Sequence, residues 1–483
     1  MNVRISSIKI RIALQLLLSG ASSYSCSDAP LSQETENTHS PSETDIENVP
    51  LPLCDGTFEH SATLSSAIPT VGIVEWSTTA PADSGYIEFG IDTSYGYVAP
   101  VNINAPELRT LLLGMKPSTL YHYRFVLVSD NQKCGSADNT IRSGALATGL
   151  PTLTTKRLEP ASISDDFIVT SSDRYAIVLD KDGDIVWWLN FADKGADAIS
   201  RVHISNDGQY LWAGNLNISA RDGLLFRVNM DGLGEPETLH INRHHDFCVL
   251  PDNGIAYIEY DIDEEGKCDK IVERSEDGKT ETIYRIREDF NALAPTVGLS
   301  DSWNSTEWCH SNAIHYVPEE DAYYVSVLHQ NMILKIDRSR RKLVWALDGD
   351  GHKVSNVRYL DGPYWQRQHG HHSFENGRLL FFNNGEAGFD NPDGSAVLEL
   401  AIDEKQGTAS KIWEYNAGFL STTLGDVQQL SNANFLIVYS NNGLIQEIAP
   451  KGAFGGTLVR TLATAGFGYA DARSSLYGSP DRF

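Results

Sequence analysis

Apolar and polar positions alternate along the chain in short runs that turn residues separate. Between residues 58 and 149 the clearest runs are Val71–Trp76, Gly85–Gly90, Arg109–Leu113 and Tyr121–Val128. Alternation with a period of two predicts β-strands that bury one face, and the turn residues between the runs predict antiparallel connections. The pattern therefore predicts a small β-sandwich over residues 53–149.

From residue 150 onward one pattern recurs six times: a strand, a polar turn and a second strand that often ends in Trp. The copies begin at Tyr175, Gly223, Lys270, Asn331, Ala396 and Gly443. A short strand precedes most of these hairpins, as at Gln209–Ala213 and Ile255–Tyr260. Propeller blades of four strands take about 40–50 residues, and more with insertions. The repeat predicts a six-bladed β-propeller over residues 150–483, because a two-sheet sandwich would not explain a hairpin that recurs at this spacing.

One segment of the predicted sandwich has a recognisable sequence. Leu112–Arg124 resembles the late-strand region of fibronectin type III-like domains. The resemblance implies a fibronectin type III-like or Ig-like sandwich. Domains of this kind usually orient a partner or a neighbouring module, and we find no catalytic constellation in this part of the sequence.

The first 26 residues have the pattern of an export signal. Basic residues precede the apolar run Ile12–Leu18, and the small residues Ser19–Ser23 follow it. The run is shorter than the roughly 20 residues of a membrane-spanning helix, and its flanks are typical of a secretory signal. Cys26 follows as in a lipoprotein signal, so lipidation, simple cleavage and an inner-membrane anchor stay open. Residues 27–52 are polar and predict a flexible linker. We expect an exported protein, in the periplasm or anchored to a membrane as a lipoprotein.

The charge balance narrows the choice of partners. The 38 basic and 64 acidic residues give a net charge of −26. Nucleic acid requires a basic surface, so this balance argues against it as a partner. An anionic substrate would have to be attracted by a local cationic site.

The cysteines predict disulfides, which export permits. Cys54 and Cys134 bracket the sandwich, and we expect them to pair. Cys248 and Cys268 form a second candidate pair that leaves Cys309 over, unless Cys248 packs as a small apolar residue. The absence of a CxxC pair from the sequence argues against a structural zinc site.

The histidines gather in particular places. Eight of the 14 lie in stretches that lead into the turns after the innermost strands: His203, His244, His245, His310, His315, His369, His371 and His372. Several blades would thus direct imidazoles at one axis. This placement predicts a polar site at the channel mouth, and the alternative is a set of buried hydrogen bonds that hold the blades together.

The same residues carry a resemblance to bacterial arylsulfate sulfotransferases. The matching segments are His244–Asp246 with Leu250–Gly254, Trp308–Ile314, Gln368-His369 with Phe381–Gly385, and Gly425–Gln428 with Asn434–Ile437. The resemblance covers most of residues 160–465. It implies an exported six-bladed propeller with an N-terminal sandwich that moves a sulfuryl group from a phenolic sulfate ester to a phenolic acceptor. It implies no nucleotide donor and no cofactor.

The resemblance also implies roles for individual residues. His369 matches the nucleophile that forms a sulfohistidine, and His245 and His310 match the histidines that hold the sulfuryl oxygens. A neutral imidazole is a good nucleophile near neutral pH. We expect the substrate to be bound by His244, Asn312, His329, Arg367, His371 and Asp426. His371 is a rival nucleophile, because residues two apart on a strand share a face, and His372 should point away.

The sequence departs from the family at two positions. Leu328 stands where the family has an active-site Arg, and Asn383 replaces an Asp. Arg367 or His329 could supply the missing donor. Three aromatic residues could stack on a phenol or could belong to the propeller core: Trp308, Tyr364 and Trp365.

Two other functions stay open at this point. The histidines, together with Asp246 and Asp426, could hold a divalent ion for a hydrolase or lyase. The propeller could instead bind a ligand without catalysing a reaction. A lipid anchor through Cys26 and a homodimer also stay open.

Overall fold

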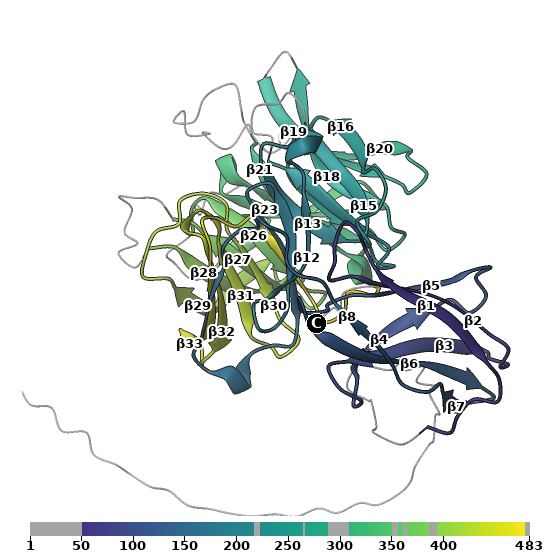
Figure 1. Cartoon of the computed structure of the whole chain (residues 1–483). Helices are drawn as coiled ribbons and strands as arrows, with labels where there is room; N and C mark the ends of the chain where they lie inside the picture. The colour runs from purple at the N-terminus through teal and green to yellow at the C-terminus, as the bar shows by residue number, and fades with distance from the viewer. Residues whose placement is uncertain are drawn as a thin grey trace, which may run out of the picture. The chain divides into compact units, whose positions relative to one another are not determined.

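The computed structural model describes residues 51–216, 223–263, 266–287, 309–349, 356–360, 365–385 and 394–478. These residues form antiparallel sheets, which confirms the all-β prediction (Figure 1). The predicted signal and linker, residues 1–26 and 27–52, lie almost entirely outside the described ranges. None of the helical segments inside those ranges has the length and apolar character needed to cross a bilayer.

Two sheets face each other in the N-terminal part. One contains β1 (Phe58–Leu64), β2 (Gly72–Thr78) and β5 (Leu108–Leu112). The other contains β3 (Ser84–Gly90), β4 (Gly96–Val101), β6 (Leu120–Ser129), β7 (Gln132–Gly135) and β8 (Asn139–Arg142). Trp76 and Phe125 meet in the core between them, with ring centroids 4.6 Å apart. The predicted disulfide between Cys54 and Cys134 is confirmed, and it joins the segment before β1 to β7.

Six further sheets follow. The first is built from β10 (Phe167–Ser172), β11 (Tyr175–Leu179), β12 (Ile185–Asn190) and β34 (Ala470–Arg473). The second is built from β13 (Ile199–Ile204), β14 (Tyr210–Asn215), β15 (Gly223–Asn229) and β16 (Glu237–Ile241). The third is built from β17 (Arg243–Val249), β18 (Ile255–Asp263), β19 (Gly266–Arg274) and β20 (Thr280–Arg285).

The fourth sheet is built from β21 (Ser311–Val317), β22 (Ala322–Val327), β23 (Met332–Asp337) and β24 (Lys342–Asp348). The fifth is built from β25 (Arg358–Tyr359), β26 (Gln368–Ser373), β27 (Arg378–Asn383), β28 (Ala396–Asp403) and β29 (Thr408–Asn416). The sixth is built from β9 (Thr154–Arg157), β30 (Asp426–Gln429), β31 (Phe435–Tyr439), β32 (Leu444–Pro450) and β33 (Gly456–Ala463). All six hairpins that the repeat predicted are present.

The innermost strands contact one another in sequence: β13, β17, β21, β26 and β30, with β34 in contact with both β30 and β13. The two ends of this region exchange strands, since β34 is innermost in the first sheet and β9 is outermost in the sixth. This is the strand arrangement of a six-bladed β-propeller. Because each innermost strand starts at the same mouth of the channel, residues at those starts can meet although they are far apart in sequence.

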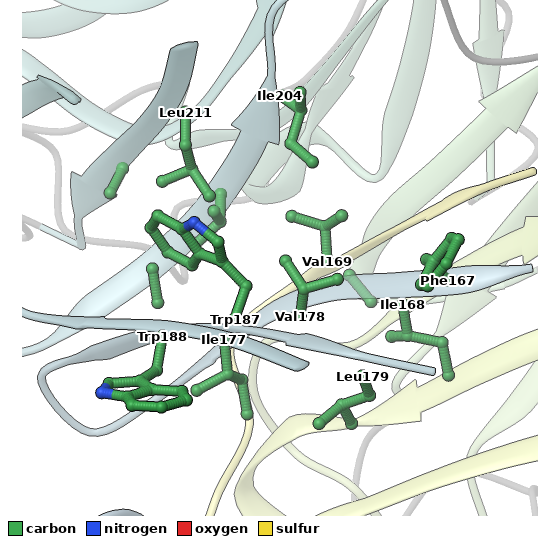
Figure 2. Packing of buried hydrophobic residues seen from close by; sticks show 14 of the residues in the cluster. Phe167, Ile168, Val169, Ile177, Val178, Leu179, Trp187, Trp188, Ile204 and Leu211 are labelled. Carbon is green, nitrogen blue, oxygen red and sulfur yellow. The ribbon is translucent and has the colours of Figure 1, made fainter. Parts of the chain in front are cut away.

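The first two blades bury a cluster of aromatic and aliphatic side chains (Figure 2). Trp187 lies there on the same side of its sheet as Val178, with Leu211 of the second blade on that side, and its indole Nε1 donates to the carbonyl of Met230 at 2.7 Å. Burial of such side chains stabilises a fold by about 1.5–3 kcal/mol each. The indole hydrogen bond satisfies the one polar atom that the large ring brings into the core.

Lys116, at the end of the sandwich, contacts the turn between β11 and β12. Its Nζ lies 2.6, 2.8 and 2.6 Å from carboxylate oxygens of Asp180, Asp182 and Asp184. These hydrogen bonds raise the pKa of Lys116 despite its partial burial, which lowers it. Within the described ranges, these three aspartates form the acidic group compact enough to share a cation, and the lysine ammonium supplies that charge.

The second disulfide differs from the prediction. Cys268 pairs with Cys309, and Cys248 is a buried free thiol. The predicted pair Cys248–Cys268 was wrong because the two residues lie toward opposite ends of one sheet. Cys248 is opposite Ala256 on β18 and Cys268 is opposite Asp261 on the same strand. Five residues of strand span about 17 Å, far more than a disulfide bridges.

Candidate active site

The chain bends unusually at the entry to four successive innermost strands. The backbone φ angles are +52° at His245, +53° at His310, +59° at Arg367 and +55° at Leu424. The left-handed region costs a residue other than glycine about 1–3 kcal/mol, and such strain is concentrated at functional sites. The ladder of each innermost strand in the third, fourth and fifth sheets also contains an irregularity close to this point. The bends place side chains from several blades at one mouth.

Four imidazoles gather at this mouth. The ring of His310 lies 4.8 Å from that of His245 and 4.6 Å from that of His329, measured between centroids. Burial keeps the pKa of His245 well below its usual range, and the neighbouring rings of His244, His310 and His369 add to this effect because a protonated His245 would repel a proton on any of them. His245, His310, His329 and His369 therefore form one cluster, which we call the imidazole cluster, and His245 is neutral at pH 7.

His369 is held by two carbonyl oxygens. Its Nδ1 lies 2.6 Å from the side-chain oxygen of Asn384 and 3.3 Å from the backbone oxygen of Arg367. The Asn384 amide nitrogen donates to the carbonyls of Ser421 and Leu424 at 2.8 and 2.7 Å. Burial lowers the pKa of His369 to about 4, although both hydrogen bonds at Nδ1 raise it. His369 is thus a neutral, fixed imidazole at neutral pH.

His244 lies behind the imidazole cluster and is fully buried. Its Nε2 is 2.9 Å from a carboxylate oxygen of Asp269, and its Nδ1 is 2.8 Å from Nδ1 of His245. Its ring stacks on Tyr260 with centroids 3.9 Å apart. Burial raises the pKa of Asp269, but the contact with His244 and the hydrogen bonds from Ser311 outweigh it and hold the pKa below its usual value. His244 contacts His245 and not the open side of the site.

Arg243 stabilises the bend at His245 through hydrogen bonds from its guanidinium. Its guanidinium donates to the backbone oxygens of His245 and Leu224, both at 3.3 Å, and also to the carbonyl of Asn215. Burial lowers its pKa to about 10. A Cβ on Gly214 would lie 2.6 Å from the Arg243 side chain, so glycine at this position makes room for the guanidinium.

A second buried network lies deeper in the channel. Arg201 binds Asp246 at 2.6 Å and Asp426 at 2.8 Å, and its guanidinium lies over the ring of Tyr469. Burial raises the pKa of Asp426 to about 6, against the opposing effect of Arg201. Asn312 donates to the backbone oxygen of Gln368 at 2.8 Å. Asp426 and Asn312 thus connect blades through these contacts.

His371 belongs to this deeper level. Its Nδ1 lies 3.3 Å from Oγ of Ser373, its ring centroid lies 6.3 Å from that of His315, and burial lowers its pKa to about 4. The irregularity between Gln368 and His371 breaks the alternation that would place His369 and His371 on one face. The Nδ1 of His372 accepts a hydrogen bond from the backbone N–H of Gln429 on the next blade.

The segment that contains Leu328 supports His310. The backbone N–H of buried Leu328 donates to the carbonyl of His310 at 3.2 Å, and that of His329 donates to Cys309 at 3.1 Å. Arg367 is close enough for its charge to lower the pKa of His369. Both residues expected to compensate for Leu328 are therefore at the site.

Of the three aromatic candidates, Trp365 is the one that the structure describes. Trp365 is fully buried and packs in the propeller core, with its ring 5.0 Å from Phe381. Trp308 and Tyr364 lie outside the described residues.

Sequence reasoning missed two residues of the site. Asn384 stands in the FFNNG segment that carries the resemblance, and its place one residue before Gly385 is the signal that could have identified it. Asp269 follows Cys268 in a segment with no motif, and nothing in the sequence pointed to its contact with His244.

Solved structures with a similar fold are distant in sequence. The periplasmic gluconolactonase PpgL of Pseudomonas aeruginosa is 11% identical, with a TM-score of 0.38 over 64% of this chain and 98% of that one. A calcium-binding protein, regucalcin, from Agrobacterium tumefaciens is 13% identical, with a TM-score of 0.32 over 74% of this chain and 92% of that one. Similarity at this level carries no information on function. None of the curated proteins matches the sequence.

A family model gives the clearest relationship. The model of the arylsulfotransferase (ASST) family matches residues 152–453, which is more than half of the chain. The matched segment begins just before β9 and ends between β32 and β33, and it includes every residue of the imidazole cluster. The chain belongs to the arylsulfotransferase family.

Proposed function

We propose that this protein transfers a sulfuryl group from an aryl sulfate to a phenol through a sulfohistidine formed on Nε2 of His369. Membership of the arylsulfotransferase family supports aryl sulfotransferase activity in general. The observation that carries the finer proposal is the pair of carbonyl oxygens at Nδ1 of His369, from Asn384 and Arg367.

Those two contacts determine the tautomer of His369. Two backbone carbonyls surround the Asn384 nitrogen, so the amide must present its oxygen to His369. Two acceptors at Nδ1 require that Nδ1 carry the proton. A neutral imidazole with hydrogen on Nδ1 has its lone pair on Nε2. The low pKa of His369, about 4, leaves that lone pair unprotonated at pH 7.

In the first half-reaction the lone pair of Nε2 attacks sulfur. The N–S bond forms as the bond between sulfur and the phenolic oxygen breaks, and its electron pair leaves with the phenolate. The sulfohistidine keeps its proton on Nδ1, so the ring is cationic and the hydrogen bond to Asn384 becomes stronger. In the second half-reaction the acceptor oxygen attacks sulfur and the N–S electron pair returns to Nε2. Splitting the transfer in this way replaces one difficult step by two easier ones.

The negative charge on the sulfuryl oxygens needs donors in fixed positions. Three side chains near His369 can supply these donors: His310, His329 and Arg367. Arg367 would provide the positive charge that the family's arginine provides at the position of Leu328. Donors that are positioned before the reaction are often the largest contribution to catalysis. His310 and Arg367 lie at bends where innermost strands begin, and His329 lies in the turn Leu328–Gln330 that hydrogen-bonds to the His310 segment, so the backbone holds all three donors in place.

Trapping the intermediate tests the proposal. The full-length protein is incubated with 4-nitrophenyl sulfate without an acceptor, digested at neutral to alkaline pH and analysed by mass spectrometry. We expect one added sulfuryl group on the peptide that contains His369. In a separate assay, protein that has not been digested should transfer the sulfuryl group to added phenol. His369→Asn should abolish both, whereas His245→Asn and His310→Asn should retain a trace.

His240→Asn is the matched control, because His240 is an exposed imidazole on β16 outside the imidazole cluster. This variant should acquire the sulfuryl group and transfer it to phenol as the parent protein does. Label on another residue, or full activity of His369→Asn, would reject the assignment of the nucleophile.

The two disulfides are consistent with an oxidising compartment, and we extend the proposal to export through the N-terminal signal. The donor and acceptor would then be phenolic compounds outside the cytoplasm. Lipidation at Cys26 is part of the same hypothesis, and mass spectrometry of the mature N-terminal peptide from the native host would test it.

A further inference from the structure

We propose that Asp269 and His244 hold His245 in the tautomer that accepts the proton of the acceptor phenol on Nε2. His245 would be the general base of the second half-reaction, and Asp269 and His244 would be positioning residues. The inference rests on the proposed sulfuryl transfer, and it adds an acid–base function to a histidine that the resemblance links only to the sulfuryl oxygens.

Both oxygens of the buried Asp269 carboxylate accept hydrogen bonds. One oxygen of Asp269 lies 2.9 Å from Nε2 of His244, and the other accepts the backbone N–H of Ser311 at 2.6 Å. An ionised carboxylate only accepts hydrogen bonds, so Nε2 of His244 must carry a proton. A neutral His244 then has its lone pair on Nδ1.

The contact between His244 and His245 then determines the tautomer of His245. Nδ1 of His244 lies 2.8 Å from Nδ1 of His245, and a hydrogen bond between two nitrogens needs one proton. If His244 has the lone pair, Nδ1 of His245 must be the donor. The remaining nitrogen of His245, Nε2, then has the lone pair and can accept a proton.

The surrounding structure holds this chain of three groups in place. The ring of His244 stacks on Tyr260 at an interplanar angle of 13°. Asp269 follows Cys268, whose disulfide to Cys309 attaches β19 to the segment that carries His310 and Ser311. Asp269 and His244 are both buried, so water does not compete for their hydrogen bonds. The carboxylate is therefore tied both to the base and to the fourth blade.

The proton balance of the cycle is complete without another reactant. In the second half-reaction the O–H bond of the acceptor breaks, its proton moves to Nε2 of His245, and the oxygen forms a bond to sulfur as the N–S bond breaks. The resulting imidazolium is stabilised through His244 by the negative charge of Asp269. In the next first half-reaction this proton passes to the departing phenolate oxygen, and His245 is neutral again.

Asp269→Asn should reverse the tautomers. An asparagine that still accepts the N–H of Ser311 through its oxygen would present its amide nitrogen to Nε2 of His244. Nε2 would then become the acceptor and Nδ1 the donor, so His245 would carry its proton on Nε2 and could no longer act as a base. A substitution of this type in a catalytic triad lowers kcat about ten-thousandfold by the same reversal.

Two half-reactions measured separately test the inference. Stopped-flow release of 4-nitrophenol from 4-nitrophenyl sulfate reports the first, because this leaving group needs no protonation. Transfer to phenol reports the second. We expect Asp269→Asn to keep the burst of 4-nitrophenol and to lose about a hundred- to ten-thousandfold in transfer to phenol.

The acceptor series supplies a readout that a purely structural defect would not change. With pentafluorophenol, which is ionised at neutral pH, no base is needed. The variant should therefore approach the parent rate with this acceptor, and its deficit should grow as the pKa of the acceptor rises. His244→Gln should show the same dependence, and it keeps the inference testable if Asp269→Asn fails to fold.

Asp261→Asn is the matched control. Asp261 lies on β18 of the same blade, and its carboxylate pairs with Arg285. It should leave both half-reactions unchanged. An equal loss with phenol and pentafluorophenol in both variants, or loss of the burst together with transfer, would overturn the role of Asp269 and His244. Absence of any burst in the parent protein would instead contradict the proposed function itself.

Discussion

The side-chain oxygen of Asn384 lies 2.6 Å from Nδ1 of His369, and the nitrogen of the same amide is held by two backbone carbonyls. Asn384 follows β27, while those carbonyls lie in the segment that leads to the sixth blade. One amide therefore determines which nitrogen of His369 is free and also joins two blades.

Removing this amide should lower the rate of sulfuryl transfer strongly and the stability of the fold only moderately. Asn384→Ala leaves Nδ1 of His369 without its closest acceptor, so the ring loses its preference for a lone pair on Nε2. We expect transfer to phenol to fall about a hundredfold or more, since a misplaced nucleophile costs this much in well-ordered sites. Steady-state rates with 4-nitrophenyl sulfate and phenol would measure the loss.

The control variant Asn434→Ala separates the loss of transfer from the loss of stability. Asn434 is also buried, in the sixth blade, and its nitrogen donates to the backbone oxygen of Ser162 and to the carboxylate of Glu447 at 2.8 and 2.7 Å. Each substitution removes an amide nitrogen that donates two hydrogen bonds, and each hydrogen bond contributes about 0.5–1.5 kcal/mol to stability. Thermal unfolding should show similar losses for both variants. If Asn434→Ala lost transfer as strongly as Asn384→Ala, the special role of Asn384 would be wrong.

The pKa of His369 predicts an unusual pH dependence. Burial lowers the pKa to about 4, well below the usual range of a histidine. Protonation of Nε2 removes the nucleophile, so activity should be present above the folded-state pKa and decline as the pH falls through it. We expect the acid limb of kcat/KM below pH 5. A limb near 6.5, in a protein that remains folded at that pH, would contradict a buried neutral nucleophile.

Much of the fold could be predicted because its local pattern repeats. The hairpin at Tyr175–Asn190 alternates apolar and polar positions, and its copies are present as three further hairpins of similar length and two that follow longer insertions. Position along an innermost strand was also predictable, which is why His245, His310 and His369 meet as the sequence indicated. A period-two pattern and a recurring turn are properties of neighbouring residues, and neighbouring residues are what a sequence displays directly.

Contacts across the sheet could not be predicted in the same way. Asp269 contacts His244 although β18 lies between their strands, and Cys268 of the third blade pairs with Cys309 at the start of the fourth. Neither contact has a local signal, because each depends on the register of strands that are far apart in sequence. The irregularity at Gly370 similarly moved His371 away from His369, since alternation alone cannot show where a ladder is interrupted.

That irregularity gives a prediction about Gly370. A Cβ at this position would lie 2.1 Å from a carboxylate oxygen of Asp426 and 2.8 Å from its Cα. Because Arg201 holds this carboxylate, the residue cannot move aside easily. Gly370→Ala should therefore displace the strand that carries His369 and lower both the thermal stability and the rate of transfer. Gly466→Ala is the control, since its nearest contact would be 3.7 Å away.

The last prediction concerns the cation of the site. Leu328 is buried beside His310 at the fourth blade, and the charge of Arg367, at the entry to the strand of the fifth blade that carries His369, acts on His369. If Arg367 holds the sulfuryl oxygens in place of the family's arginine, Arg367→Met should lower kcat about a hundred- to a thousandfold, the usual cost of one lost oxyanion donor. Arg367→Lys should recover only part of it, because an ammonium cannot bind two oxygens in the planar manner of a guanidinium.

Leu328→Arg completes the comparison. Added to the parent protein it should change the rate little, because the charge is already present. Added to Arg367→Met it should restore a measurable part of kcat, because a guanidinium would return from the position that the family uses. Rates with 4-nitrophenyl sulfate and phenol for the four proteins would form a double-mutant cycle, and unfolding curves would show whether the buried arginine is tolerated. Purely additive effects of the two substitutions would mean that Arg367 and the position of Leu328 do not share a role.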